Sequence, residues 1–208
     1  MLVLVGAGLL AAALLLRDPV GDQASAPSAP PVPQPAAFDP GAVTTAPTTP
    51  AGVGAGWAEP SRGRRALRGF GEVAGTVTAP DGTVCSVCLL AALDEAQRGR
   101  GLMEVTDRAL GGYDGMVFVF EEPVSGSFWM RNTPMPLSIA YLDVAGRAVD
   151  VFDMKPCSDS PSCPGYPPSA PFGFALEVPE GNFEALGLTK GAVLRLTATP
   201  CPLARKPG

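Results

Sequence analysis

Residues 18–60 carry ten of the chain's 24 prolines, many alanines and threonines, and no lysine or arginine. A segment with so few large apolar side chains cannot bury enough surface to offset the entropy lost on ordering. Prolines separated by Ala, Val and Thr favour an extended, polyproline-like spacer. We therefore expect residues 18–68 to form a disordered spacer with an arginine-rich end, which leaves about 140 residues for one modest core.

The segment before the spacer is apolar. Residues 2–16 contain no charged side chain, and the run ends at Arg17. A run of about fifteen residues is short for a membrane span and typical of the core of a signal peptide. Ala24-Ser25-Ala26 has the form of a cleavage site, although it lies far from the run, and no basic residue precedes the run. Residues 1–17 are expected to be a signal peptide or a membrane anchor, which makes the protein extracytoplasmic, either secreted or held at the membrane by this segment.

Four arginines lie at the end of the spacer, between residues 62 and 68. They could contact phosphate head groups or an anionic wall polymer, or they could form a solvated junction. From Ser61 onward the chain is nearly neutral, with 14 basic and 16 acidic residues. Nucleic acid is therefore not expected as a partner, because there is no broad basic face.

Short strand patterns fill the rest of the chain. Residues 116–120 are apolar at every position, which predicts a central strand, and residues 137–143 and 147–153 form a hairpin pattern. Asp94 and Asn182 are expected to cap two short helices. About seven short strands with two short helices predict a mainly β (α+β) domain over residues 69–204, with a small, mainly antiparallel, barrel-like sheet.

The five cysteines are expected to be oxidised in an exported protein. Cys157 and Cys163 enclose a short polar loop that suits a local disulfide. Cys85 and Cys88 have C-x-x-C spacing, but they fall in a strand pattern, where positions i and i+3 face opposite sides. One of this pair is expected to reach Cys201, and we favour Cys88, which leaves Cys85 over.

The chain contains no histidine. This excludes Ser-His and Cys-His nucleophilic machinery and makes a zinc site a poor interpretation, since the cysteines are expected to be paired. Five methionines within the domain raise the alternative of a copper(I) site, but their spacing favours core positions. We assign no catalytic residue, no metal and no cofactor.

The ten residues from Phe128 to Leu137 combine an aromatic pair with polar groups and two prolines. Trp129, Arg131 and Asn132 leave a predicted strand together, and an indole, a guanidinium and an amide could bind a carboxylate, a phosphate or a sugar hydroxyl. Alternatively, Arg131 and Asn132 could hold the loop at Pro134 by satisfying backbone carbonyls.

Two further residues complete the predicted site. Tyr166 lies beside the predicted disulfide loop, where it could close over the same cleft or simply pin the loop. Glu177 lies between Leu176 and Val178 in a strand pattern, so it could be an inward-facing acid or lie on an exposed face.

The Phe128–Leu137 run resembles the signature of the family called domain of unknown function 192. The other segments that carry the resemblance are Gly101–Met103, Gly115–Phe118, Asp143–Arg147 and Ala175–Val178. The resemblance covers roughly residues 70–200 and implies a compact, β-rich fold. The family's own function is not established.

The chain departs from the family pattern at two positions. Many members carry an arginine two residues after Met103, where this chain has Val105, with Arg108 nearby. Members also often carry an aspartate after Leu137, where this chain has Ser138. If that aspartate is an acid or base in the family, this chain cannot use it, which lowers the expectation of catalysis.

The leading hypothesis is an exported or membrane-tethered β-domain that binds a small polar ligand or an envelope polymer without catalysis. One alternative is an enzyme that acts on envelope carbohydrate through carboxylates, which would require a second acid facing Glu177 across one cleft. Another is a structural scaffold without a ligand.

Overall fold

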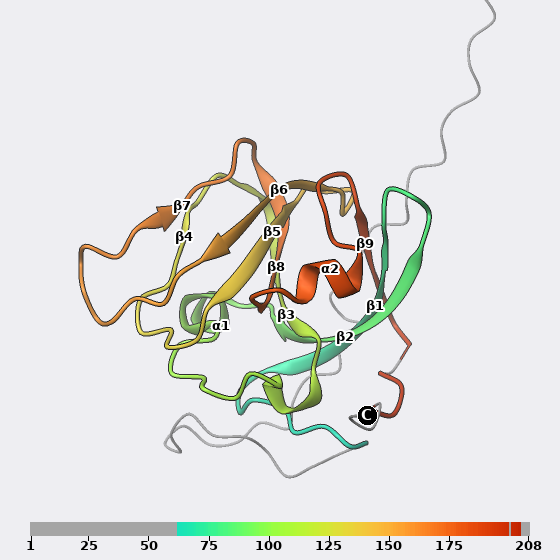
Figure 1. The fold of residues 1–208 in the computed structure, drawn as a ribbon, viewed down its shortest axis with the longest axis horizontal. Coiled ribbons are helices and arrows are strands. Elements are labelled where there is room, and N and C mark those ends of the chain that lie inside the picture. The colour runs from blue at the N-terminus through green and yellow to red at the C-terminus, as the bar shows by residue number, and fades with distance from the viewer. Residues whose placement is uncertain (1–61, 200, 205–208) are drawn as a thin grey trace, which may run out of the picture. The chain divides into compact units, whose positions relative to one another are not determined.

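The computed structural model describes residues 62–199 and 201–204 (Figure 1). Its strands are β1 (Gly71–Thr78), β2 (Val84–Ala92), β3 (Gly115–Val124), β4 (Phe128–Trp129), β5 (Leu137–Leu142), β6 (Ala148–Met154), β7 (Gly165–Tyr166), β8 (Phe172–Pro179) and β9 (Val193–Thr197). The helices are α1 (Glu95–Arg100) and α2 (Asn182–Leu186), and η2 (Leu110–Gly112) is a 3-10 turn. The predicted mainly β fold with two short helices is confirmed.

Seven strands form one sheet in the order β6-β5-β8-β3-β2-β1-β9, and β4 and β7 form a separate ribbon. No helix in the described ranges is both long and apolar enough to cross a membrane. The predicted signal or anchor segment, residues 1–17, and the predicted spacer up to residue 61 lie outside those ranges.

The sheet is mainly antiparallel, as predicted, but it is mixed, because it contains one parallel pair. β2 and β3 run parallel, with Leu89 opposite Gly115 and Ala92 opposite Phe118. Parallel neighbours need a crossover connection, because the chain has to return to the end from which it started. The segment between the two strands provides it and contains α1 and η2. Residue propensities identify strands but not their relative direction, so the sequence pattern did not predict that β2 and β3 run parallel.

α1 begins as the sequence predicts. The Asp94 carboxylate accepts a hydrogen bond from the Gln97 backbone N–H, and the Gln97 side chain accepts one from the Asp94 N–H, which forms a capping box. Gly101 ends the helix. At α2 the cap prediction is wrong by one residue: Gly181, with positive φ, is the N-cap, and Asn182 is the first helical residue.

β8 lies between β5 and β3 and is antiparallel to both. Alternate side chains of a strand point to opposite faces of its sheet. Leu176 and Val178 accordingly pack into one core, and Ala175 packs into the other. Glu177 lies two residues after Ala175 and therefore shares its face.

The two faces of the sheet carry different cores. One core is aliphatic and is covered by Phe183 and Leu186 of α2. The other is rich in aromatic rings and thioethers and includes Met116, Met130, Met135 and Met154. Those four methionines are at most 4% exposed, so they fill space in a packed core.

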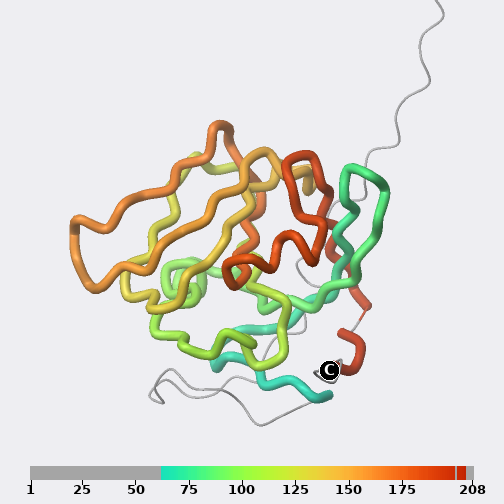
Figure 2. Tube along the Cα trace, in the orientation of Figure 1, coloured from blue at the N-terminus to red at the C-terminus, as the bar shows by residue number. Residues whose placement is uncertain are grey.

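The sheet does not close into the predicted barrel-like form, because β6 and β9 remain its two edges (Figure 2). They approach at one corner, where Leu194 N–H donates to the Gly146 carbonyl and Ala148 N–H donates to the Ala192 carbonyl, both at 2.8 Å. Glycine is needed there, since a Cβ at residue 146 would lie 2.2 Å from the Leu194 carbonyl oxygen. Past this corner no ladder between β6 and β9 is present in the described residues.

Part of the arginine-rich segment belongs to the folded domain rather than to a solvated junction. Arg64 is only 7% exposed. Its Nε donates to the Gly112 carbonyl at 2.9 Å, and Nη1 donates to the Pro202 carbonyl at 2.5 Å. Leu67 and Phe70 lie in the aromatic core. Arg64 thus joins the entry of the domain to its carboxyl end.

Two disulfides are present with the pairings favoured from the sequence. Cys88 of β2 is bonded to Cys201, with 5.5 Å between the Cα atoms. Cys157 and Cys163 close the short loop between β6 and β7, with Cα atoms 5.9 Å apart. Both distances fit disulfide geometry. Cys85 is free and partly exposed.

The two disulfides are expected to differ in their effect on stability. They span 113 and 6 residues of sequence, and a longer closed loop restricts the unfolded chain more. The paired change Cys88→Ala and Cys201→Ala should lower the free energy of unfolding by roughly 4–5 kcal/mol, against roughly 2 kcal/mol for Cys157→Ala and Cys163→Ala. Urea denaturation of the two double variants measures both. Equal losses would contradict the entropic account.

Candidate functional site

The five residues predicted to form a site do not form one cluster. Trp129 and Glu177 line the same cavity. Asn132 lines a second hollow together with Asp159, and Arg131 forms an ion pair with that aspartate. Tyr166 is part of the small ribbon beside the cavity, where it pairs with Phe128.

The first cavity, called here the Glu177 cavity, has a volume of about 420 Å³. This falls within the range of small-molecule sites, roughly 300–1,000 Å³. Its aromatic wall comes from β3, β4 and β8, and α1 with the turn after it contributes the other side. The aromatic residues that line it are Phe118, Phe120, Phe128, Trp129 and Phe172.

The aromatic wall is a packed unit. The Phe118 and Phe128 rings meet edge to face with centroids 4.8 Å apart, and the Phe120 and Phe172 rings do so at 5.2 Å. Such pairs stabilise one another beyond the area they bury. Trp129 differs from them, because it is 54% exposed. The inner rings are therefore fixed, and the indole lies where the wall meets solvent.

Glu177 is an acid inside this apolar surrounding. It is 4% exposed, and its strand neighbours are Met116 in β3 and Ile139 in β5. No hydrogen bond or ion pair to its carboxylate is found within the described part of the chain. Burial raises the pKa of the Glu177 carboxyl from 4.5 to about 8, because the ionised form loses its hydration. The sequence left open whether the Glu177 side chain faces inward or lies on an exposed face, and in the structure it faces inward.

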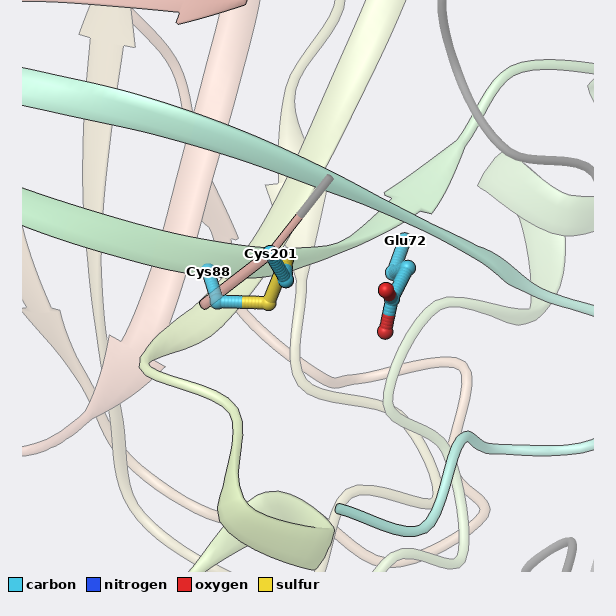
Figure 3. A group of neighbouring side chains, drawn as sticks. All are labelled: Glu72, Cys88 and Cys201. Atoms are coloured by element: carbon cyan, nitrogen blue, oxygen red, sulfur yellow. A yellow bond between two sulfur atoms is a disulfide. The ribbon is translucent and has the colours of Figure 1, made fainter. Parts of the chain in front are cut away.

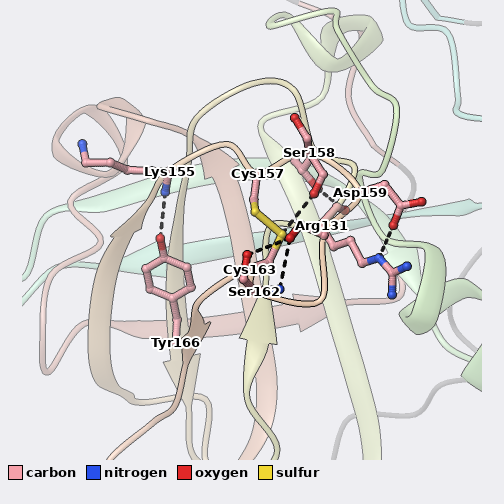
Figure 4. Close-up of a disulfide and its surroundings, with 10 residues drawn as sticks. Arg131, Lys155, Cys157, Ser158, Asp159, Ser162, Cys163 and Tyr166 are labelled. Atoms are coloured by element: carbon pink, nitrogen blue, oxygen red, sulfur yellow. Dashed lines mark hydrogen bonds and ion pairs between the residues drawn. A yellow bond between two sulfur atoms is a disulfide. The ribbon is translucent and has the colours of Figure 1, made fainter.

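Arg131 and Tyr166 hold the disulfide loop (Figure 4). Arg131 Nε donates to Asp159 Oδ1 at 2.5 Å, with the two side chains 40% and 61% exposed. The Tyr166 hydroxyl accepts a hydrogen bond from the Lys155 backbone N–H at 3.0 Å, and the Tyr141 hydroxyl donates to the Tyr166 carbonyl. These contacts match the alternative in which Tyr166 pins the loop.

Asn132 has a backbone role. Its φ of 55° is in the left-handed region, and its carbonyl accepts a hydrogen bond from the Glu104 N–H at 2.8 Å. The hollow beside it has a volume of about 590 Å³ and is lined by polar residues and prolines, including Thr133 and Asp159. Thr133 also lines the Glu177 cavity, so the segment around Asn132 forms the wall between the two spaces.

The departures from the family pattern lie away from the Glu177 cavity. Val105 is buried in the aromatic core, and Arg108 is exposed. Ser138 pairs with Val178 on the opposite face of the sheet from Glu177. The Ser138 hydroxyl donates to Asp153 Oδ1 of β6 at 2.5 Å, so a carboxylate is still present beside this position.

One group of side chains has metal-binding elements. One ligand atom each from Glu72, Cys88 and Cys201 lies within 4.8 Å of the others (Figure 3). The two sulfurs form a disulfide, whereas metal ions bind thiolates. The Glu72 carboxylate accepts a hydrogen bond from the Tyr113 hydroxyl at 2.6 Å. With the disulfide formed, these three side chains therefore stabilise the fold and do not form a metal site.

Sequence reasoning missed most of the cavity wall. Phe118 and Phe120 were assigned to a central strand, and that pattern gave no sign that the ring side chains border an open space. Arg98 of α1 also lies in the cavity lining, with its guanidinium 5.0 Å from the Phe120 ring centroid. Local sequence patterns could not predict this wall, because it forms only when the fold brings α1, β3 and the more distant β8 together.

Comparisons with known proteins agree with this fold. The family model DUF192, described as an uncharacterised ACR, matches residues 76–196. A protein of unknown function from Novosphingobium aromaticivorans is 28% identical, with a TM-score of 0.54 over 72% of this chain and 99% of its own. A proposed transcription regulator from Sinorhizobium meliloti is 23% identical, with a TM-score of 0.53 over 62% of this chain and 97% of its own, and this likeness shows the fold alone. No curated protein matches the chain.

The raised pKa of Glu177 makes stability depend on pH. Between the unfolded value of 4.5 and the folded value of about 8, the native carboxyl holds a proton that the unfolded chain releases. The free energy of unfolding should therefore fall as pH rises through this window, by a few kcal/mol in total, and level off above it. Urea denaturation at pH 5 and pH 8 measures the fall. It should be smaller in Glu177→Gln and unchanged in Glu184→Gln, a control on an exposed face of α2. Equal pH dependence in wild type and Glu177→Gln would contradict the assignment.

The ion pair of Arg131 is expected to contribute little to stability. Both partners are substantially exposed, and such pairs contribute about 0–1 kcal/mol. Arg131→Ala should therefore lower the free energy of unfolding by less than about 1 kcal/mol.

Tyr141→Phe, in contrast, removes a fully buried hydroxyl that accepts a hydrogen bond from the Phe128 N–H and donates one to the Tyr166 carbonyl. This change should lower the free energy of unfolding by about 1–3 kcal/mol. Thermal or urea denaturation of the Arg131→Ala and Tyr141→Phe variants compares their stability losses. A larger loss in Arg131→Ala than in Tyr141→Phe would refute the prediction.

Proposed function

The chain belongs to DUF192, a family described as uncharacterised, and from its geometry we propose that it is an exported binding module without catalysis. Its ligand is a small polar molecule, or one unit of an envelope polymer, held in the Glu177 cavity. The observation that carries the proposal is a carboxyl at the wall of an aromatic cavity that is 4% exposed and has no partner among residues 62–199 and 201–204. A buried polar group without a partner is costly, and a ligand that supplies the partner recovers that cost.

Two features support a location outside the cytoplasm. The Cys88–Cys201 and Cys157–Cys163 disulfides are stable in oxidising compartments and rare in reducing ones. The sequence also has an apolar segment, residues 2–16, followed by a proline-rich spacer. A spacer of that composition would hold a binding domain away from a membrane surface.

A hydrolase is the second candidate, because a second acid shares the cavity. Glu95, in the first turn of α1, also lines it. A buried acid of raised pKa beside an exposed carboxylate is the arrangement that glycoside hydrolysis uses. Incubation with nitrophenyl glycosides tests this candidate. Turnover that Glu177→Gln and Glu95→Gln both abolish would replace the binding proposal with a hydrolase.

The binding proposal predicts that ligand contacts map to the cavity. Two-dimensional NMR with soluble cell-wall fragments, sugars and small amines should show shifts at Trp129 and along β3 and β8. Trp129→Ala should weaken such binding by roughly two- to twelvefold, because stacking on an aromatic ring contributes roughly 0.5–1.5 kcal/mol beyond area burial. Val144→Ala is the matched control, since Val144 is also exposed but lies in the β5–β6 turn. Shifts confined to other surfaces would count against the proposal.

A further inference from the structure

The groups that line the Glu177 cavity are not equally available to a ligand. Arg98 Nη1 donates to the Leu93 and Val119 carbonyls, and Arg100 Nη1 donates to the Arg68 carbonyl at 2.7 Å. Arg100 Nη2 lacks a partner but is closed to solvent, so a molecule in the cavity does not reach it.

The hydroxyl groups of the lining are also engaged. Ser127 donates to the Phe128 carbonyl at 3.2 Å, and Thr133 donates to the Arg131 carbonyl at 3.3 Å. Glu95 and Glu177 are the acidic side chains of the lining, and neither has a partner in the described residues. Both acceptor side chains among the unmatched groups of the described lining are therefore carboxyls, which calls for a ligand that brings hydrogen-bond donors or positive charge.

We propose that the ligand of the Glu177 cavity is an organic amine, with its ammonium group against Glu177 and its apolar body along the aromatic wall. This rests on the proposed function of the cavity as a binding site and adds the class of ligand. A carboxylate and an ammonium form a charge-assisted hydrogen bond, which is stronger than a neutral one. The partner that Glu177 lacks would then come from the ligand.

Aromatic rings in the lining suit both the apolar body and the charge of an organic cation. Phe118, Phe128 and Phe172 lie in the cavity lining, and ring faces attract a cation within about 6 Å of their centroids. A sugar would need partners for several hydroxyls. The Ser127 and Thr133 hydroxyls and the Nη1 groups of Arg98 and Arg100 already donate to backbone carbonyls. A volume of about 420 Å³ accommodates an amine built on one ring.

Binding of an amine should also release a proton. Without a ligand, Glu177 holds its proton near neutral pH, since its pKa is raised to about 8 by burial. A neighbouring ammonium favours the ionised carboxylate. The other titratable groups around it are Glu95, Arg98 and Arg100 of α1 and Tyr141 of β5, whose pKa is raised to about 12. Glu95→Gln therefore serves as the variant that separates the two acids.

The test is isothermal titration of the full chain with benzylamine, benzyl alcohol and methyl glucoside. Titration at pH 6.5 in two buffers of different ionisation enthalpy gives the number of protons released. Benzylamine should bind with release of a proton, and benzyl alcohol should bind at least about tenfold more weakly. Glu177→Gln should weaken benzylamine binding at least about tenfold and abolish the proton release. Glu184→Gln should change neither, and Glu95→Gln should keep the proton release.

Three results would overturn the proposal. If benzyl alcohol or methyl glucoside binds as tightly as benzylamine and Trp129→Ala weakens it, the ligand is not an amine, but the cavity remains a binding site. If none of the three probes binds and cell-wall fragments give no NMR shifts at the cavity, both the amine and the binding function fail. Benzylamine binding that Glu177→Gln leaves unchanged would place the amine elsewhere and overturn the assignment.

Discussion

The parallel pairing of β2 with β3 determines how the cavity is built. Parallel strands cannot be joined by a tight turn, so the connecting chain has to leave the sheet and return. In doing so it carries α1 to the side of the aromatic core. Arg98 fastens the helix to both parallel strands, because Nη1 donates to the carbonyl of Leu93, which follows β2, and to that of Val119 in β3. The same crossover places Gly101 against Phe118, where an added Cβ would lie 3.2 Å from the ring.

Glu177 owes its position to the place of β8 in the sheet. An interior strand is covered on both faces, and its backbone groups are used by two neighbours, so a polar side chain there depends on other side chains for partners. The neighbours that register brings beside Glu177 are apolar on both sides, Met116 and Ile139. The carboxyl therefore contributes nothing favourable to the isolated fold. Its side toward the cavity is open to a ligand that supplies a partner.

Much of the fold followed from local pattern, and most of the site did not. The capping box at Asp94, the β5–β6 hairpin and the Cys157–Cys163 loop are encoded within a few residues, and each was predictable. The parallel pair, the burial of Arg64 and the inward face of Glu177 depend on contacts between distant segments. Arg64 bonds to carbonyls 48 and 138 residues away. No local pattern predicts such long-range hydrogen bonds. From the sequence alone, an arginine-rich segment is therefore expected to be exposed to solvent.

The polar residues of the Phe128–Leu137 run support the structure, and its aromatic residues border the cavity. Its most polar members, Arg131 and Asn132, support structure: one pairs with Asp159 of the disulfide loop and the other supplies a backbone carbonyl to Glu104. Bridges from Cys157 to Arg131 and Thr133 fix this segment to the disulfide loop. Because Thr133 lines the Glu177 cavity, the disulfide braces one wall of it. The polar end of the run thus holds the cavity in shape, while its aromatic start, at Phe128 and Trp129, borders the space that a ligand would enter.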